Sequence, residues 1–216
     1  MARIEDRWGP PIDVRSLRQL YAPQEIRPFT PTPAGIDNLA LTSVDTFLIR
    51  NNGGYQKHEV HFDGYFQVAR GQPTTDSWSS CEVYVNMTDI VLHAKSEVKG
   101  LGRMKVHRNP DVLSAGQTFA AGGKTAAAAC RIAASVVFEV PDRKMSLFNK
   151  EPVLLMNGGI KSIPPVEDPN GTAHNYLLPL YSTSDPNGRP VAYLESLRYT
   201  VGNYLTQQAV EAIRAR

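Results

Sequence analysis

The fold is indicated most directly by residues 51–69, which read NNGGYQKHEVHFDGYFQVA. Asn and Gly tolerate the positive φ angles that tight hairpin turns require, so residues 51–54 predict a turn. The residues that follow alternate between an apolar and a polar face, the period-two pattern of a β-strand with one buried side. The apolar face carries Val60, Phe62, Phe66 and Val68, and the polar face carries Glu59, His61, Asp63, Tyr65 and Gln67.

Strand-forming segments lie on both sides of this turn. Residues 44–50 are rich in β-forming side chains and supply the first strand of the hairpin. Residues 81–93 alternate again, with Cys81, Val83, Val85 and Met87 on the apolar face. Further strands are predicted over residues 103–108, 117–120, 127–140, 144–148, 152–156, 176–183 and 190–201. Residues 126–134 are rich in alanine, so a helix is the alternative for that part.

Turn signals separate these segments. Asn157-Gly158-Gly159 predicts one turn, and Asp-Pro-Asn-Gly occurs twice, at residues 168–171 and 185–188. The second copy is expected to join the strands over 176–183 and 190–197 as a hairpin. We therefore predict an all-β fold, an antiparallel β-barrel or β-sandwich of roughly eight to ten strands, because closing the sheet removes its unpaired edges.

The two ends of the chain have a different character. Residues 1–36 are expected to form an N-terminal segment, with a short helix over 14–21 and a proline-rich arm over 22–35. Residues 37–216 are predicted to form a single all-β domain. This domain ends in an amphipathic helix over 205–214.

Composition excludes several classes of function. The chain has 216 residues, of which 42% are hydrophobic and 20% charged, and a net charge of +2 that is too small to indicate nucleic-acid binding. It contains neither an apolar run long enough for a membrane helix nor a secretory signal, and its two cysteines form no CxxC pair. We therefore expect a cytoplasmic protein without nucleic-acid or membrane partners.

Common cofactor motifs are also missing from the sequence. Residues 122–125 read GGKT, but Thr118 stands where a phosphate-binding loop needs its first glycine. Neither a GxSxG nucleophile elbow nor a GxGxxG dinucleotide motif occurs. No cofactor is therefore expected.

The polar face of residues 59–65 supplies one group of candidate site residues. An imidazole titrates near neutral pH, so His61, oriented by Asp63, could act as a general acid or base if this face lined a cavity. Glu59 and Tyr65 would then contact the substrate. The alternative is that the whole row is the solvated outer face of an antiparallel sheet.

Asp89 and His93 form a second group. Strict alternation along residues 81–93 places both on the apolar face with Met87, where an inward polar pair would indicate a pocket. The alternative is a bulge near Thr88, after which both side chains reach water. A metal site would need His61 together with His93 or His107, because His58 and His61 point to opposite faces of a strand.

Three further candidates are scattered. His174 and Tyr176 lie where a loop enters a strand, a place where ligand-binding groups often occur at the mouth of a barrel. Glu195 alternates with Tyr193 and Leu197, so it is either a pocket carboxylate or a charge that faces solvent.

Taken together, the sequence favours a barrel or sandwich that encloses a small hydrophobic organic molecule. The corresponding enzyme would be a cofactor-independent isomerase, cyclase or lyase with His61, Asp63 and His93 as catalytic residues. Its substrate-binding residues would be Glu59, Tyr65, Asp89, His174, Tyr176 and Glu195. One alternative is a non-catalytic assembly module, a homodimer joined through the N-terminal arm. Another is a metal-dependent enzyme that uses the histidines.

Overall fold

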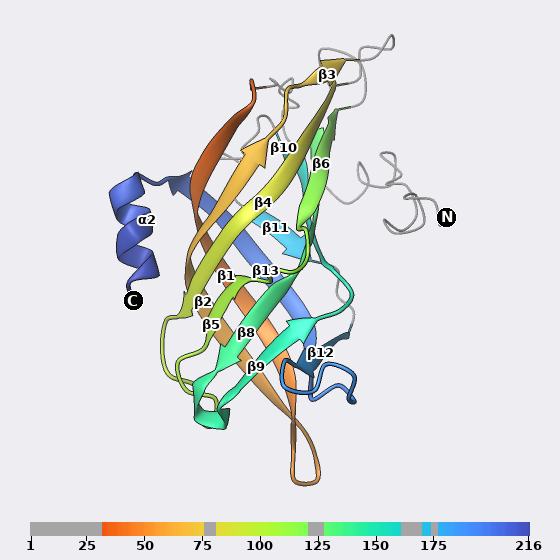
Figure 1. Cartoon of the computed structure of the whole chain (residues 1–216), viewed down its shortest axis with the longest axis vertical. Coiled ribbons are helices and arrows are strands. Elements are labelled where there is room, and N and C mark those ends of the chain that lie inside the picture. Colours follow the sequence, from red (N-terminus) through yellow and green to blue (C-terminus); the bar gives the residue numbers. More distant parts are fainter. Residues whose placement is uncertain (1–31, 76–80, 121–127, 161–169, 174–176) are drawn as a thin grey trace.

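A computed structural model describes residues 32–75, 81–120, 128–160, 170–173 and 177–216. Within these residues lie thirteen strands, one turn of 3-10 helix and one α-helix (Figure 1). The strands are β1 (Gly35–Asn51), β2 (Gly54–Arg70), β3 (Thr74–Thr75), β4 (Cys81–Ala94), β5 (Lys105–Arg108), β6 (Ala115–Ala120), β7 (Ala128–Ala134), β8 (Val136–Val140), β9 (Met145–Asn149), β10 (Val153–Ile160), β11 (Asn170–Ala173), β12 (Leu178–Ser182) and β13 (Ala192–Tyr204). The helices are η2 (Pro141–Arg143) and α2 (Gln207–Arg214). The helix predicted over 14–21 and most of the predicted arm lie outside the described residues.

The strands close into a barrel-like ring with eight positions. Four positions hold the long strands β1, β2, β4 and β13, and β1 pairs with β13 to close the ring. Each of the other four positions holds two short strands end to end, namely β6 with β5, β7 with β8, β10 with β9, and β11 with β12. All pairings are antiparallel, so the predicted all-β antiparallel fold is confirmed in its barrel form.

The ring therefore has two halves that share the four long strands. We call the half completed by β6, β7, β10 and β11 the upper half, and the half completed by β5, β8, β9 and β12 the lower half, as they stand in Figure 1. The upper half is tied together by the β4–β6, β6–β7, β7–β10, β10–β11 and β11–β13 pairings. The lower half uses the β4–β5, β5–β8, β8–β9, β9–β12 and β12–β13 pairings.

Buried polar side chains stabilise the break between β7 and β8. The Ser135 N–H donates to Ser114 Oγ at 2.9 Å, and the Val136 N–H donates to Asn149 Oδ1 at 2.8 Å. Asn149 Nδ2 donates in turn to the carbonyls of Ala134 and Glu151, at 3.0 and 2.8 Å. Buried backbone groups need partners, and these side chains supply them where the ladder is interrupted. The strand predicted over 127–140 is thus a strand and not a helix, but it is divided at Ser135.

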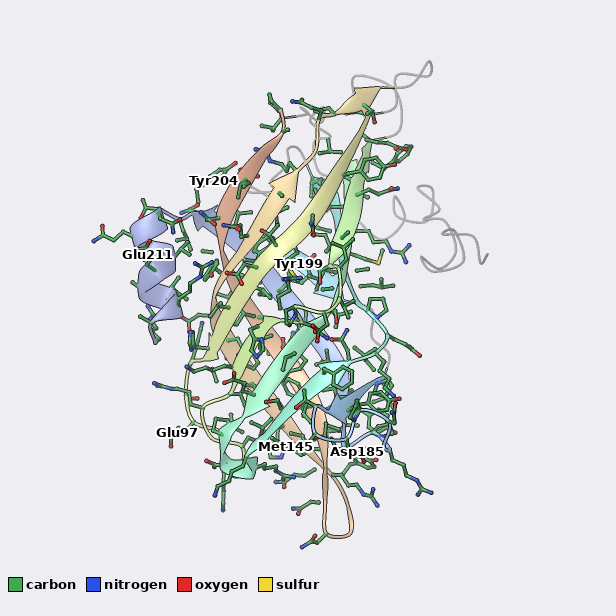
Figure 2. All side chains as sticks on the ribbon, viewed as in Figure 1. Glu97, Met145, Asp185, Tyr199, Tyr204 and Glu211 are labelled. Atoms are coloured by element: carbon green, nitrogen blue, oxygen red, sulfur yellow. The ribbon has the colours of Figure 1, made fainter. Side chains whose placement is uncertain are left out.

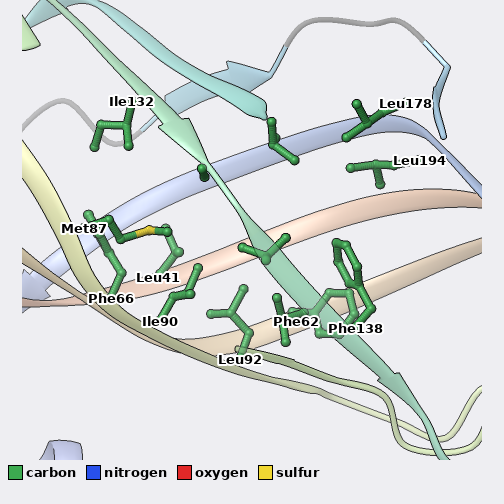
Figure 3. Close-up of a cluster of buried hydrophobic side chains, with 14 of the residues drawn as sticks. Leu41, Phe62, Phe66, Met87, Ile90, Leu92, Ile132, Phe138, Leu178 and Leu194 are labelled. Atoms are coloured by element: carbon green, nitrogen blue, oxygen red, sulfur yellow. The ribbon is translucent and has the colours of Figure 1, made fainter. Parts of the chain in front are cut away.

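The predicted hairpin and its phase are confirmed. A two-residue turn at Asn52 and Gly53 joins β1 to β2, and Gly53 has a φ of 141° that favours glycine. The apolar face of β2 points into the barrel, where Val60, Phe62, Phe66 and Val68 are buried in the core. Figure 3 shows Phe62 and Phe66 packed among side chains from the neighbouring strands.

Strand β4 changes phase at a bulge. Asp89 pairs with Gln67 and Met87 pairs with Val68, so Thr88 is an extra residue on the β4 side. Its hydroxyl donates to Gln67 Oε1 at 2.8 Å. Val85 and Met87 face inward before the bulge and Ile90 and Leu92 after it, which leaves Asp89 and His93 on the outer face. The strict alternation that placed them with Met87 is wrong for this reason.

Turn and helix predictions have mixed outcomes. The turn predicted at Asn157-Gly158-Gly159 is wrong, because β10 continues to Ile160 and pairs with β7 through this segment, with one irregularity. The hairpin between β12 and β13 and the C-terminal helix are confirmed. Thr206 caps α2 by accepting a hydrogen bond from the Ala209 N–H at 3.3 Å. Part of the first Asp-Pro-Asn-Gly copy, at residues 168–169, lies outside the described residues.

The lower half is filled by large side chains. Phe47 and Phe138 meet edge to face with ring centroids 5.1 Å apart, and Leu147 and Leu180 are fully buried in the same core. Edge-to-face pairs of this kind add to the stabilisation that burial alone provides.

In the described part of the chain, no helix has the length and apolarity needed to span a membrane.

Candidate functional site

A cavity of about 40 Å³ lies inside the upper half of the barrel. Its lining comes from six strands, β1, β2, β4, β7, β10 and β13, and ten of its twelve residues are apolar. The lining residues are Leu39, Leu41, Phe66, Val68, Val85, Met87, Cys130, Ile132, Leu155, Asn157, Tyr199 and Val201. Asn157 and Tyr199 are the two that carry polar groups.

Small side chains on β7 leave room for the cavity. Strand β7 reads AACRIAA, and its buried positions include Ala128, Cys130 and Ala134. Strand β8, which continues it into the lower half, reads VVFEV and contributes Phe138. Small side chains leave space that larger ones fill, so the same long strands enclose a void above and a solid core below.

Two buried polar side chains continue the inner row of β1 below the cavity. This row runs Leu39, Leu41, Ser43, Asp45 and Phe47, all of them buried. Asp45 is 1% exposed, and its Oδ1 finds no hydrogen-bond partner among the described residues. The Ser43 Oγ is also buried and makes no hydrogen bond of normal geometry to another described residue. Burial raises the pKa of the Asp45 carboxyl to about 7, and the nearby Ser43 hydroxyl acts in the opposite direction.

Asp45 is not among the residues predicted to form a site, although the sequence contains a signal for it. Asp45 alternates with Phe47 and Ile49 in a strand whose partner has a clearly apolar inner face. A charged side chain in that phase is an exception to the pattern and therefore a candidate. It was missed because its immediate neighbours are typical strand formers.

Two other titratable groups face the interior, and one of them, the His58 Nε2, is buried without a hydrogen-bond partner among the described residues. His58 faces inward from β2, and burial followed by the charge of Arg143 lowers its pKa, which favours the neutral ring. Cys130 lines the cavity, but burial raises the pKa of its thiol to about 11. A thiol that stays protonated at neutral pH is a weak nucleophile.

The structure places the predicted residues Glu59 and His61 on the outer surface of β2. Both side chains are more than half exposed, and Glu59 Oε1 lies 3.2 Å from His61 Nε2. They point away from Val60 and Phe62, which belong to the core. The pair therefore does not line the cavity.

Tyr65 and Asp89 are brought together on the outer face, underneath α2. The Tyr65 hydroxyl donates to Asp89 Oδ2 and accepts from Arg214 Nε, and Arg214 Nη2 lies 2.5 Å from the same carboxylate oxygen. Burial, followed by the hydrogen bond to Asp89, raises the pKa of Tyr65 to about 12. Figures 1 and 2 show α2 lying against the outside of the barrel.

His93 and Asp63 also contact the C-terminal end of the chain. His93 is buried, and its Nε2 lies 2.9 Å from the carbonyl of Ile213, so this nitrogen carries the proton and donates. Burial lowers the pKa of His93, and the bond to Ile213 opposes that effect. Asp63 Oδ2 lies 3.4 Å from Arg216 Nη1. Four of the predicted residues thus contact α2 or the residues that follow it: Asp63, Tyr65, Asp89 and His93.

The remaining predicted residues lie elsewhere. The register between β1 and β13 moves from Thr46–Ser196 to Phe47–Leu194, which leaves Glu195 as an extra residue. Its Oε2 lies 2.5 Å from Lys57 Nζ, and Lys57 is exposed. His174 and Tyr176 lie outside the described residues. Over the described part of the chain, no group of three His, Cys, Asp or Glu side chains could hold a metal ion.

Comparison with known proteins identifies a family and one similar structure. The model of a family of unknown function, DUF6073, matches residues 2–211. Among solved structures, the chain is similar to DynF from the dynemicin biosynthesis pathway of Micromonospora chersina, with 36% identity and a TM-score of 0.76. That match covers 93% of this chain and 95% of DynF. No curated protein matches the chain. Because the family model spans almost its whole length, the chain belongs to the DUF6073 family of unknown function.

Proposed function

We propose that this protein binds a small apolar organic molecule inside the upper half of its barrel. The observation that carries the proposal is the cavity lining, in which ten of twelve side chains are apolar and two supply polar groups. Binding sites for small molecules usually combine a mainly apolar surface with a few placed polar groups. In the lower half, the large buried side chains of Phe47 and Phe138 occupy the interior instead.

The size of the cavity sets a condition on this proposal. A void of about 40 Å³ accommodates a few water molecules, so a larger ligand must displace side chains of the lining. Met87 is suited to this, because its unbranched side chain adopts many shapes at little cost. Leu155 and Tyr199 are only partly buried, so they are less tightly held than the core of the lower half.

Similarity to DynF supports a role connected with small organic molecules. DynF is described as part of the dynemicin biosynthesis pathway, and this chain resembles it over almost its full length. A role for this chain in handling a biosynthetic compound would fit an apolar interior. The proposed activity is binding, because His61, Asp63 and His93 point to the outside of the barrel and cannot reach a ligand in the cavity.

A titration with the apolar fluorescent dye Nile red tests the proposal. Leu155→Trp adds bulk to the cavity lining, and we expect it to weaken dye binding at least about tenfold, a loss of about 1.4 kcal/mol. Tyr84→Trp is the matched control, because Tyr84 is exposed on the outer face of β4 and should leave binding unchanged. A bound ligand at one hundred times its dissociation constant should also stabilise the wild type by about 2.7 kcal/mol in thermal unfolding.

Two results would contradict the proposal. One is a wild-type protein that binds neither Nile red nor any member of a panel of apolar molecules of graded size. The other is Leu155→Trp protein that folds, by circular dichroism, and binds the dye as tightly as the wild type.

A further inference from the structure

We propose that Asp45 and Ser43 form a polar anchor beneath the cavity, which holds the hydroxyl group of an otherwise apolar ligand. This inference rests on the proposed function and adds the chemical class of the ligand. It assigns a binding role to two side chains of β1 that point into the barrel.

The register of the sheet places the anchor directly next to the lining. Ser43 follows the lining residue Leu41 by two positions on the same face of β1, and its partner on β13 is the lining residue Tyr199. Asp45 comes two positions further along the same inner row. Side chains two residues apart on a strand are neighbours on one face, so the row leads from the apolar lining to the carboxyl group.

Two buried oxygens of the anchor, the Ser43 Oγ and the Asp45 Oδ1, make no hydrogen bond of normal geometry within the described residues. The Ser43 hydroxyl lies close enough to the carboxyl to lower the pKa of Asp45, but it leaves Oδ1 without a partner. Buried polar groups are usually paired, and an unpaired group costs free energy. A ligand hydroxyl can donate to the carboxyl oxygen and accept from the serine hydroxyl, so a single group satisfies both side chains.

The surroundings of Asp45 favour a neutral hydroxyl over a cationic amine. Its cross-strand partners are Val60 on β2 and Leu197 on β13, both apolar. Burial raises the pKa of Asp45 to about 7, so the carboxyl is largely protonated below neutral pH and attracts a cation less strongly. Bringing a cation into this interior would also require stripping its water.

The outer cluster under α2 makes a useful contrast. In this cluster the side chains of Tyr65, Asp89 and Arg214 hydrogen-bond to one another. The hydrogen bonds pair the Tyr65 hydroxyl and the Asp89 Oδ2, unlike the buried oxygens of Ser43 and Asp45. That cluster is accounted for by the docking of the helix. The interior pair has no such explanation within the fold.

The test compares two ligands of similar shape, 1-naphthol and 1-methylnaphthalene. The first carries a hydroxyl group where the second carries a methyl group. Isothermal titration of the full chain is expected to show about tenfold tighter binding of 1-naphthol. In Asp45→Leu this preference should fall to about one, while 1-methylnaphthalene still binds. Thr46→Val is the control, because Thr46 is the next residue of β1 and faces outward, and it should keep the wild-type preference.

The possible results separate the anchor from the binding function. Equal affinities in the wild type overturn the anchor and leave the apolar site standing, whereas no binding of either molecule defeats the proposed function as well. Tighter binding of 1-naphthylmethylamine than of 1-naphthol overturns the assignment of a hydroxyl. Ser43→Ala provides a second variant should Asp45→Leu fail to fold, and it should reduce the preference about threefold; an unchanged preference there also counts against the anchor.

Discussion

The two halves of the barrel share four long strands but differ in their interiors. In the lower half Phe47, Phe138 and Leu147 fill the space between the strands. In the upper half the alanines and cysteine of β7 leave a cavity next to Met87 and Leu155. Both kinds of strand contribute to this difference, since the short strand β8 and the long strand β1 supply Phe138 and Phe47 to the lower half, whereas the short strand β7 supplies small side chains to the upper half. One half is densely packed, and the other contains the cavity that we propose as a binding site.

The largest expected effect is in the lower half. Phe138→Ala should destabilise the protein by about 3–5 kcal/mol, because it removes a buried aromatic ring and its edge-to-face partner contact. Leu155→Ala in the upper half should cost about 1 kcal/mol, because this side chain is partly exposed and borders a void. Urea unfolding followed by circular dichroism measures both. Equal losses would remove the contrast between the halves.

The second effect is a pH dependence at the boundary between the halves. The pKa of Asp45 rises from 3.8 in the unfolded chain to about 7 in the folded protein. Between pH 3.8 and pH 7 the folded protein binds more protons than the unfolded chain. The stabilisation that comes from protonation of Asp45 is therefore complete below pH 3.8 and is lost as the pH rises to 7. Asp45→Asn should therefore be more stable than the wild type above pH 7, by up to about 4 kcal/mol, with the gain vanishing near pH 4.

Chemical denaturation of both proteins across pH 4–8 isolates this contribution. His58 and His93 have lowered pKa values in the folded protein, so the stability that they contribute is lost as the pH falls. This contribution is the same in the wild type and in the variant. The difference between wild type and variant then reports Asp45 alone. A difference that does not change with pH would contradict the prediction.

The third prediction concerns the break that separates the halves. Asn149→Ala removes three hydrogen bonds to backbone groups, two of them buried, so we expect a loss of about 2–3 kcal/mol. Ser135→Ala is the matched comparison at the same break. The Ser135 Oγ has no hydrogen-bond partner in the described residues, so its removal should be neutral or slightly stabilising. Thermal unfolding distinguishes them, and similar losses would show that the side-chain bonds do not support the break.

The smallest effect is expected outside the barrel. Arg214→Ala should cost about 1 kcal/mol or less, because the Arg214 side chain is about half exposed and its ion pair with Asp89 is screened by solvent. Nile red binding should not change, since α2 lies on the outer face. Loss of dye binding in this variant would show that the helix affects the cavity, and would contradict the independence of the outer cluster and the interior site.

Much of the fold could be predicted from local signals. The turn at Asn52 and Gly53, the alternation along β2 and the amphipathic helix α2 each depend on residues close in sequence, and each of these predictions is confirmed. The division at Ser135 could not be predicted, because it depends on Ser114 and Asn149, which are distant in sequence. The prediction ends strand β10 before Asn157 for a similar reason. In the structure, pairing with β7 outweighs the local preference of Asn and Gly for turns, and the strand continues.

The candidate site was harder to predict than the fold. Sequence alternation correctly grouped His61, Asp63 and Tyr65 on one face, but that face is opposite the buried one. In a closed barrel, a site in the interior must be sought among polar exceptions on the apolar face. Asp45 and Ser43 are such exceptions, and recognising them requires knowing that the sheet closes around them.

The bulge at Thr88 sets which side chains of β4 face the barrel. Because Thr88 is an extra residue, Met87 before it and Ile90 and Leu92 after it all point inward. Drawing Thr88 into the ladder would shift the pairing by one residue, so that Asp89 and His93 would enter the barrel while Ile90 and Leu92 would be exposed to water. Deleting Thr88 would instead leave every other side chain of β4 on its present face, so the strand should tolerate the loss of this residue better than the loss of its bulge.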